Sequence, residues 1–148
     1  MAAFIGGKQL QLHLAKLASQ VAAPATLRVG FLENAKYPNG TPVAMIAAIQ
    51  DFGAPRANIP PRPFFRNMIR TKQREWGPAV ARLLKANAWD AVRALNQAGQ
   101  AIAGQLRQSI QDTNFPPLQP GTIKRKGFSK PLIDTGHMFN SVDYEVTT

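Results

Sequence analysis

The chain has 148 residues and a formal net charge of +10, from 18 lysines and arginines against 8 acidic residues. It contains no cysteine, which excludes disulfide scaffolds, thiolate nucleophiles and cysteine-based zinc sites. The charge favours an acidic partner, either nucleic acid or a negative protein surface, and a basic solvated surface is an equally good explanation. No stretch reaches the ~20 apolar residues of a membrane span, so no membrane partner is expected.

The N-terminal third predicts a helix followed by a strand. Leu10, Leu14 and Leu17 recur at spacings of three and four, which predicts an amphipathic helix over residues 8–22. In residues 26–33 apolar and polar side chains alternate, which predicts a strand.

Turn formers then separate this strand from a short apolar helix. Asn39-Gly40 is typical of a tight turn, and residues 43–52 keep helical spacing. Gly53 occupies the position of a helix C-cap, and the proline-rich segment 54–63 predicts irregular structure.

The middle of the chain predicts two further helices. Pro63 suits the first position of a helix that runs to about residue 75. Gly77-Pro78 is expected to break or kink the chain, and Pro78 to open a long helix that ends near residue 111. Trp89 lies off the apolar stripe of that long helix, which suits packing against another element or subunit.

The C-terminal part predicts one long loop and one strand. Residues 114–131 are rich in proline and lysine and lack periodicity, which predicts a long loop. Residues 138–146 alternate and predict a second strand. Because two strands do not form an independently stable sheet, either residues 36–43 add strands or another subunit completes the sheet.

These elements predict one α+β domain over residues 1–148. A small antiparallel sheet packs against long helices in this arrangement, and extended loops remain available for assembly.

Catalytic material is scarce. His13 and His137 are far apart, and His137 follows Asp134-Thr135-Gly136, a sequence that is better interpreted as a turn before the last strand. No nucleophile elbow, glycine-rich phosphate loop or metal-ligand spacing is present. We therefore expect no enzyme activity, no catalytic or metal-binding residues, and no cofactor.

Two basic clusters are the candidate interfaces. The first is a row of arginines at intervals of four, most of which would lie on one helix face: Arg62, Arg66, Arg70 and Arg74. The second lies in the predicted loop and surrounds an aromatic residue: Lys124, Arg125, Lys126, Phe128 and Lys130. Mutual repulsion in the arginine row would be relieved by DNA phosphate or by a carboxylate-rich protein face, and a solvated helix face is the alternative.

Three stretches in a fixed order carry a family resemblance: residues 37–53, which end in an acidic-aromatic-glycine step, the proline-rich residues 59–66, and residues 131–142. Together they resemble the virion-morphogenesis and tail-completion proteins of tailed bacteriophages. The motif positions are Phe52, Gly53, Pro61, Pro63, Phe64, Leu132, Thr135 and Gly136.

The resemblance implies an α+β structural protein at the head–tail junction, or neck, of a virion. It implies a homo-oligomeric ring of roughly six or twelve copies around the DNA channel. The implied partners are phage adaptor or connector proteins and tail proteins, with non-specific contact to channel DNA. The protein would be made in the host cytoplasm and end in the virion. The alternatives are a tail-terminator subunit that caps the tail tube, and a free basic DNA-binding protein.

Overall fold

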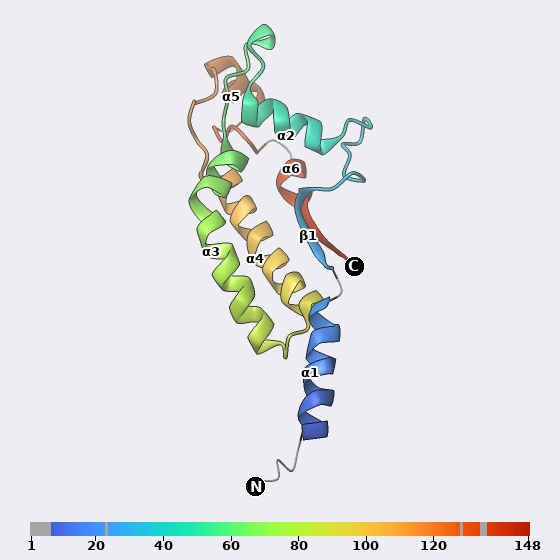
Figure 1. Ribbon diagram of the computed structural model, residues 1–148. Coiled ribbons are helices and arrows are strands. Elements are labelled where there is room, and N and C mark those ends of the chain that lie inside the picture. Colours follow the sequence, from blue (N-terminus) through green and yellow to red (C-terminus); the bar gives the residue numbers. More distant parts are fainter. Residues whose placement is uncertain (1–6, 23, 128, 134–135) are drawn as a thin grey trace.

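The computed structural model describes residues 7–22, 24–127, 129–133 and 136–148 of the chain (Figure 1). It confirms the predicted α+β class, since a two-stranded antiparallel sheet packs against helices. In chain order the described elements are α1 (Gly7–Ala22), β1 (Thr26–Phe31), α2 (Val43–Phe52), the 3-10 helix η1 (Pro55–Ala57), α3 (Phe64–Ala86), α4 (Ala91–Asp112), α5 (Pro120–Lys126), α6 (His137–Asn140) and β2 (Val142–Thr147).

The sheet pairs the two strands in a register that matches their sequence pattern. Leu27 lies opposite Val146, Val29 opposite Tyr144, and Phe31 opposite Val142. These three apolar pairs share one face, because alternate residues of a strand point to the same side. On the other face Arg28 forms an ion pair with Glu145 at 3.1 Å. The alternation predicted for the first strand is confirmed.

Helices α3 and α4 form a long antiparallel pair, and α4 lies between α3 and the sheet (Figure 1). The buried face of α4 begins with small residues, among them Ala94, Ala98 and Gly99, and continues with Leu106 and Ile110. Small side chains let the sheet approach the helix closely: a Cβ on Gly99 would clash with the Tyr144 ring and lie 2.9 Å from Leu27 Cδ1. The core then widens toward Phe64 and Val43, both fully buried.

The predicted break at Gly77-Pro78 is wrong. Helix α3 continues through Pro78 to Ala86, and the chain turns at residues 87–90. Pro78 leaves the Arg74 carbonyl without its helical donor, but residues 74–78 are largely exposed there, so water can solvate that carbonyl.

The turn between α3 and α4 uses unusual backbone geometry. Ala88 and Trp89 have φ angles of +53° and +65°, and Asp90 caps α4 by accepting a hydrogen bond from the Arg93 N–H at 3.0 Å. Trp89 is 38% exposed and lies in this turn, not on the long helix predicted for it.

Two C-terminal predictions also need correction. Residues 114–131 are not one loop, because α5 lies within them; Pro120 near its start and Gly127 at its end are the usual boundary residues of a helix. The second strand starts at Val142 and not at residue 138, since His137–Asn140 form the short helix α6.

The region 36–43 does not add a strand to the sheet. It contributes a single bridge between Lys36 and Pro42, closed by a turn with Gly40 at φ +84°. Within the described part of the chain, each strand therefore keeps one unpaired edge.

Helix α1 confirms the prediction for residues 8–22 but has no place in the core. It extends away from the other elements at the end opposite α2 and α5 (Figure 1). Three of its leucines are exposed, Leu10 and Leu14 each by 54% and Leu12 by 71%, and Leu17 is partly exposed.

Candidate functional site

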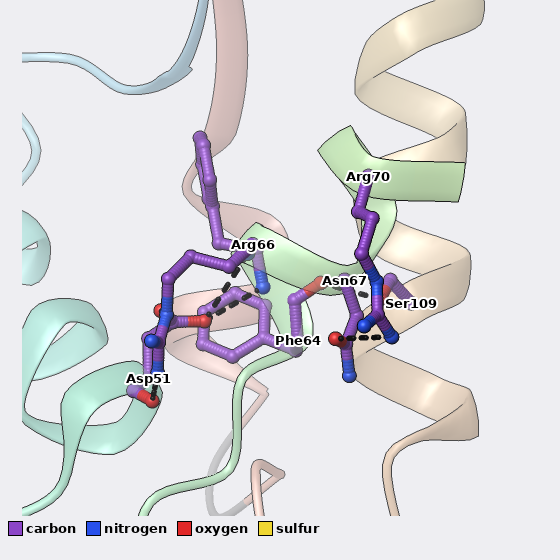
Figure 2. Close-up of polar contacts among 7 residues, drawn as sticks. Asp51, Phe64, Arg66, Asn67, Arg70 and Ser109 are labelled. Atoms are coloured by element: carbon purple, nitrogen blue, oxygen red, sulfur yellow. Dashed lines mark hydrogen bonds and ion pairs between the residues drawn. The ribbon is translucent and has the colours of Figure 1, made fainter. Parts of the chain in front are cut away.

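The junction between α2 and α3 is organised by one buried carboxylate. Asp51, in the last turn of α2, is 3% exposed. Its Oδ1 accepts hydrogen bonds from the backbone N–H groups of Phe65, at 2.9 Å, and Arg66, at 3.4 Å (Figure 2). These N–H groups belong to the first turn of α3, where Pro63 precedes the helix and offers no capping side chain. Asp51 therefore caps α3 from another helix, and its charge favours the positive end of the α3 dipole.

Arg66 binds the same carboxylate. Its Nε donates to Asp51 Oδ2 at 2.5 Å, and its Nη2 donates to the Asp51 backbone oxygen at 2.7 Å (Figure 2). The guanidinium carbon also lies 4.3 Å from the centre of the Phe52 ring, which is cation–π geometry. Arg66 and Phe52 thus cover Asp51 on the solvent side.

The glycine of the motif is required by its surroundings. Gly53 has φ +78°, and a Cβ there would lie 2.8 Å from the Pro61 nitrogen and 2.9 Å from the Ile59 oxygen. The C-cap position predicted for Gly53 is confirmed, and Gly136, which precedes α6, also has φ +78°.

Phe64 anchors the start of α3 in the core. Its side chain is fully buried and makes an edge-to-face contact with Phe31 of the sheet. Its carbonyl accepts a hydrogen bond from Ser109 Oγ of α4 at 2.7 Å (Figure 2). The stretch 51–66 therefore locks α2, α3, α4 and the sheet together.

The four arginines of the first cluster fall into two kinds. Arg62 precedes α3 and is 4% exposed, and Arg66 binds Asp51, so both have partners inside the chain. Arg70 and Arg74 are exposed on α3, and Arg70 Nη2 donates to Asn67 Oδ1 at 3.2 Å. The spacing of four predicted a shared face, and only the last two present their charge mainly to solvent.

Most of the second cluster belongs to a helix or is tied to it, and not to the loop predicted for it. Lys124, Arg125 and Lys126 form the last turn of α5, where cations are favoured by the helix dipole. Lys126 Nζ donates to the Lys130 carbonyl, and Lys130 Nζ donates to the Gln111 carbonyl, each at 3.0 Å. Phe128, the aromatic member of the cluster, lies outside the described residues.

A partly open cavity of about 850 Å³ lies between α5 and α2. Five segments line it, including α2 at Ile46 and Gln50, the start of α5 at Thr122, and α6 at Met138. Arg62 lies in its wall, and Arg125 and Lys126 bring the second cluster to its edge. The cavity thus brings together one residue of the first cluster and two of the second.

Arg62 is held in this wall by neutral acceptors. Nε donates to the Pro116 carbonyl at 2.9 Å, Nη1 to Gln50 Oε1 at 3.4 Å, and Nη2 to the Pro117 carbonyl at 3.5 Å. Burial lowers the pKa of the Arg62 guanidinium below its usual value. It stays charged at neutral pH all the same, because an arginine is protonated throughout the physiological range.

His137 contacts the segment at residues 36–37. Its Nε2 lies 2.8 Å from the Lys36 carbonyl oxygen, and its ring is tilted by 34° to the Tyr37 ring, with centres 4.7 Å apart. In the part of the chain that the structure describes, no three histidine or acidic side chains are placed to hold a metal ion. Among the helices described there, none is long and apolar enough to cross a membrane.

The third motif is described only in part. Leu132 is buried in the core cluster, as expected of an apolar side chain, and Ile133 packs against that cluster. Asp134 and Thr135 lie outside the described residues, so the turn predicted there stays a prediction.

Sequence reasoning missed two residues that organise this region. Asp51 was part of a motif but had no role assigned, although a lone acid among so many arginines was a usable signal. Gln50, which accepts from Arg62 with its side chain and from the Arg62 N–H with its carbonyl, gave no signal in the sequence.

Comparison with known proteins adds nothing to this geometry. No family model matches the chain, and neither the curated proteins nor the solved structures include a significant match.

Proposed function

We propose that this chain is a structural subunit of a tailed-bacteriophage neck, which completes the tail or joins it to the head as part of a ring around the DNA channel. The ordered motifs at residues 37–53, 59–66 and 131–142 support the family part of this proposal. Two of these motifs meet at the α2–α3 junction, where Asp51 caps α3. A rigid junction that fixes the direction of a long helix suits a part used for assembly.

The observation that carries the proposal is the surface that one copy of the chain leaves uncovered, namely exposed leucines and unpaired strand edges. Leu10, Leu12 and Leu14 of α1 are more than half exposed, and both strands of the sheet keep an unpaired edge in the described chain. An unpaired strand edge is a template for pairing with another chain, and natural proteins usually protect it. A ring of identical subunits would cover such surfaces, because each subunit presents one face to the next.

The charge suits the same location. The chain carries a net charge of +10, and Arg70 and Arg74 are exposed on α3. In a ring around DNA these side chains would contact phosphates or acidic faces of adaptor and tail-tube subunits. No chemistry is needed for this role, so the proposal includes no enzyme activity.

Deletion of the gene from its phage genome, followed by electron microscopy of the particles, tests the proposal. We expect DNA-filled heads beside finished but unattached tails, and a plasmid copy of the gene should restore infectious virions. Over-long tails would instead indicate a tail terminator. Normal virions from the deletion would contradict both functions.

A gel shift with duplex DNA separates a free DNA-binding protein from a neck subunit. A neck subunit with about three phosphate contacts should lose roughly 40-fold in affinity between about 50 and 200 mM salt. Tight binding that persists at physiological salt would contradict the structural role and favour the DNA-binding alternative.

A further inference from the structure

The cavity between α2 and α5 combines a buried positive charge with apolar walls. Its volume of about 850 Å³ lies in the range of pockets that hold small molecules or short chain segments. It is too small for a folded domain. An occupant is therefore a small molecule, a cluster of side chains or an extended chain segment.

The charge in its wall has no carboxylate partner among the described residues. Arg62 is 4% exposed, and no described carboxylate lies within ion-pair distance of it. An arginine offers five N–H donors, and three are used, all on neutral oxygens and two of them at 3.4 Å or more. Each guanidinium nitrogen thus has an acceptor, but all of these acceptors are neutral, so an anionic group in the cavity would stabilise the buried charge further.

The charge at the edge of the cavity has the same sign. Arg125 and Lys126 of α5 line it, and the described lining residues include no aspartate or glutamate. A ligand with a negative group would thus meet two cations at the edge and a third inside.

The rest of the cavity wall is largely apolar, so an anion alone would leave it without a partner. Ile46, Ile59, Leu118, Leu132 and Met138 line the cavity together with several prolines. A phosphate of duplex DNA has no apolar group to place against these side chains. An extended peptide meets both demands, because it can carry a carboxylate and apolar side chains within the length of the cavity.

We infer that this cavity binds an extended segment of a second protein that carries a carboxylate next to apolar side chains. The carboxylate pairs with Arg62 and Arg125, and the apolar side chains contact Ile46, Leu118 and Met138. The proposed function supplies only the identity of that protein, an adaptor or tail neighbour in the virion. The binding chemistry itself follows from the cavity.

Titration of the isotope-labelled full chain, followed by nuclear magnetic resonance, tests the inference. The probe is a short peptide of alternating leucine and aspartate, and the control peptide has asparagine in place of aspartate. We expect the aspartate peptide to shift the Arg62 Nε–H and the amides of Ile46 and Met138, with at least about tenfold tighter binding than the control peptide. Equal binding of the two peptides, or shifts elsewhere only, would overturn the inference.

Two variants of neighbouring residues on α5 sharpen the test. Arg125→Glu should weaken binding of the aspartate peptide by about tenfold or more. Lys124→Glu makes the same charge change one residue earlier, outside the cavity lining, and should alter binding by no more than about twofold. Equal effects would mean a diffuse charge attraction and no site. Displacement of the peptide by a short DNA duplex would also overturn the inference, in favour of a nucleic-acid surface.

Peptide binding and gene deletion together distinguish failure of this inference from failure of the proposed function. Peptide binding at the cavity with normal virions from the gene deletion leaves the site intact and removes the phage role. Unattached tails from the deletion with no peptide binding leaves the phage role intact and removes the site.

Discussion

The α2–α3 junction and helix α1 differ in how far their side chains are buried. At the junction Phe64 is fully buried and Asp51 is 3% exposed, and its carboxylate binds the Phe65 N–H and Arg66 Nε. On α1, Leu12 is 71% exposed and Leu14 54%. The side chains of the junction stabilise the fold itself, whereas those of α1 are exposed to solvent.

The junction contributes to the stability of the fold, whereas under the proposed function the exposed side chains of α1 would be covered by another subunit. A helix of 16 residues is marginal alone in water, and most helices gain stability by burying an apolar face. The junction helices have that burial, and α1 does not. Variants that remove buried contacts should therefore lower stability strongly, and variants of α1 should change assembly with little effect on stability.

Removal of the Asp51 carboxylate should have the largest effect. Asp51→Ala leaves Arg66 Nε and two backbone N–H groups of α3 without their acceptor, and we expect the free energy of unfolding to fall by about 3 kcal/mol. Asp51→Asn keeps one accepting oxygen and should cost roughly half as much. Urea unfolding measures both, and Asp112→Ala at the exposed end of α4 is the matched control. Equal losses in Asp51→Ala and the control would contradict the capping role.

Filling the space at Gly99 should come next. Gly99→Ala forces a methyl group into the Tyr144 ring and Leu27, and we expect a loss of about 2 kcal/mol despite the better helix propensity of alanine. Gly104 lies in the same helix with open space around its Cβ position, so Gly104→Ala should be neutral or stabilise by up to about 1 kcal/mol. A thermal melt of the two variants compares them directly. The same sign for both would mean that the sheet does not contact α4 as described.

The elements that local sequence predicts well were those with a clear periodic pattern of their own. The first strand and α2 follow from alternation and helical spacing, and Gly53 from its position at a helix end. Each of these signals lies within a few residues of the element it predicts. The packing of small residues such as Gly99 against Tyr144 joins segments far apart and could not be read from either one.

The turn between α3 and α4 shows where local signals mislead. Pro78 suggested a break, but an exposed helix tolerates one lost hydrogen bond, and the real turn places Ala88 and Trp89 at positive φ. Neither residue type favours that geometry, so propensity pointed elsewhere. The cap at Asp90 was the usable signal, since an aspartate before an apolar stripe is typical of a helix start.

The candidate site was predicted in outline only. The spacing of the arginines identified the row, but a spacing of four does not tell whether a side chain has an acceptor in another segment. Arg62 points to the carbonyls of Pro116 and Pro117, which are distant in sequence, and Arg66 to Asp51. Long-range partners of this kind are invisible to a charge pattern.

Charge reversals in the row should separate its two kinds of arginine. Arg66→Glu would place a second carboxylate beside Asp51 and should lower the free energy of unfolding by about 1–2 kcal/mol, since Arg66 is half exposed. Arg70→Glu on the open face should change it by less than about 0.5 kcal/mol. Because Arg66→Glu alters the fold itself, only Arg70→Glu tests the row as an interface. Equal destabilisation by the two variants would contradict the assignment of Arg66 to the junction.

The smallest effect on stability is expected on α1, with the clearest effect on assembly. Leu14 shares one face of the helix with Leu10 and Leu17, whereas Leu12 lies on the opposite face. Leu14→Ser and Leu12→Ser make the same chemical change at exposed positions, so each should alter the free energy of unfolding by less than about 0.5 kcal/mol. In complementation of the gene deletion, Leu14→Ser should fail to restore virions and Leu12→Ser should succeed, because a neighbouring subunit would cover only the face that carries three leucines. Success of both variants would mean that α1 needs no partner, and failure of both would mean that the helix itself, and not one face of it, is required.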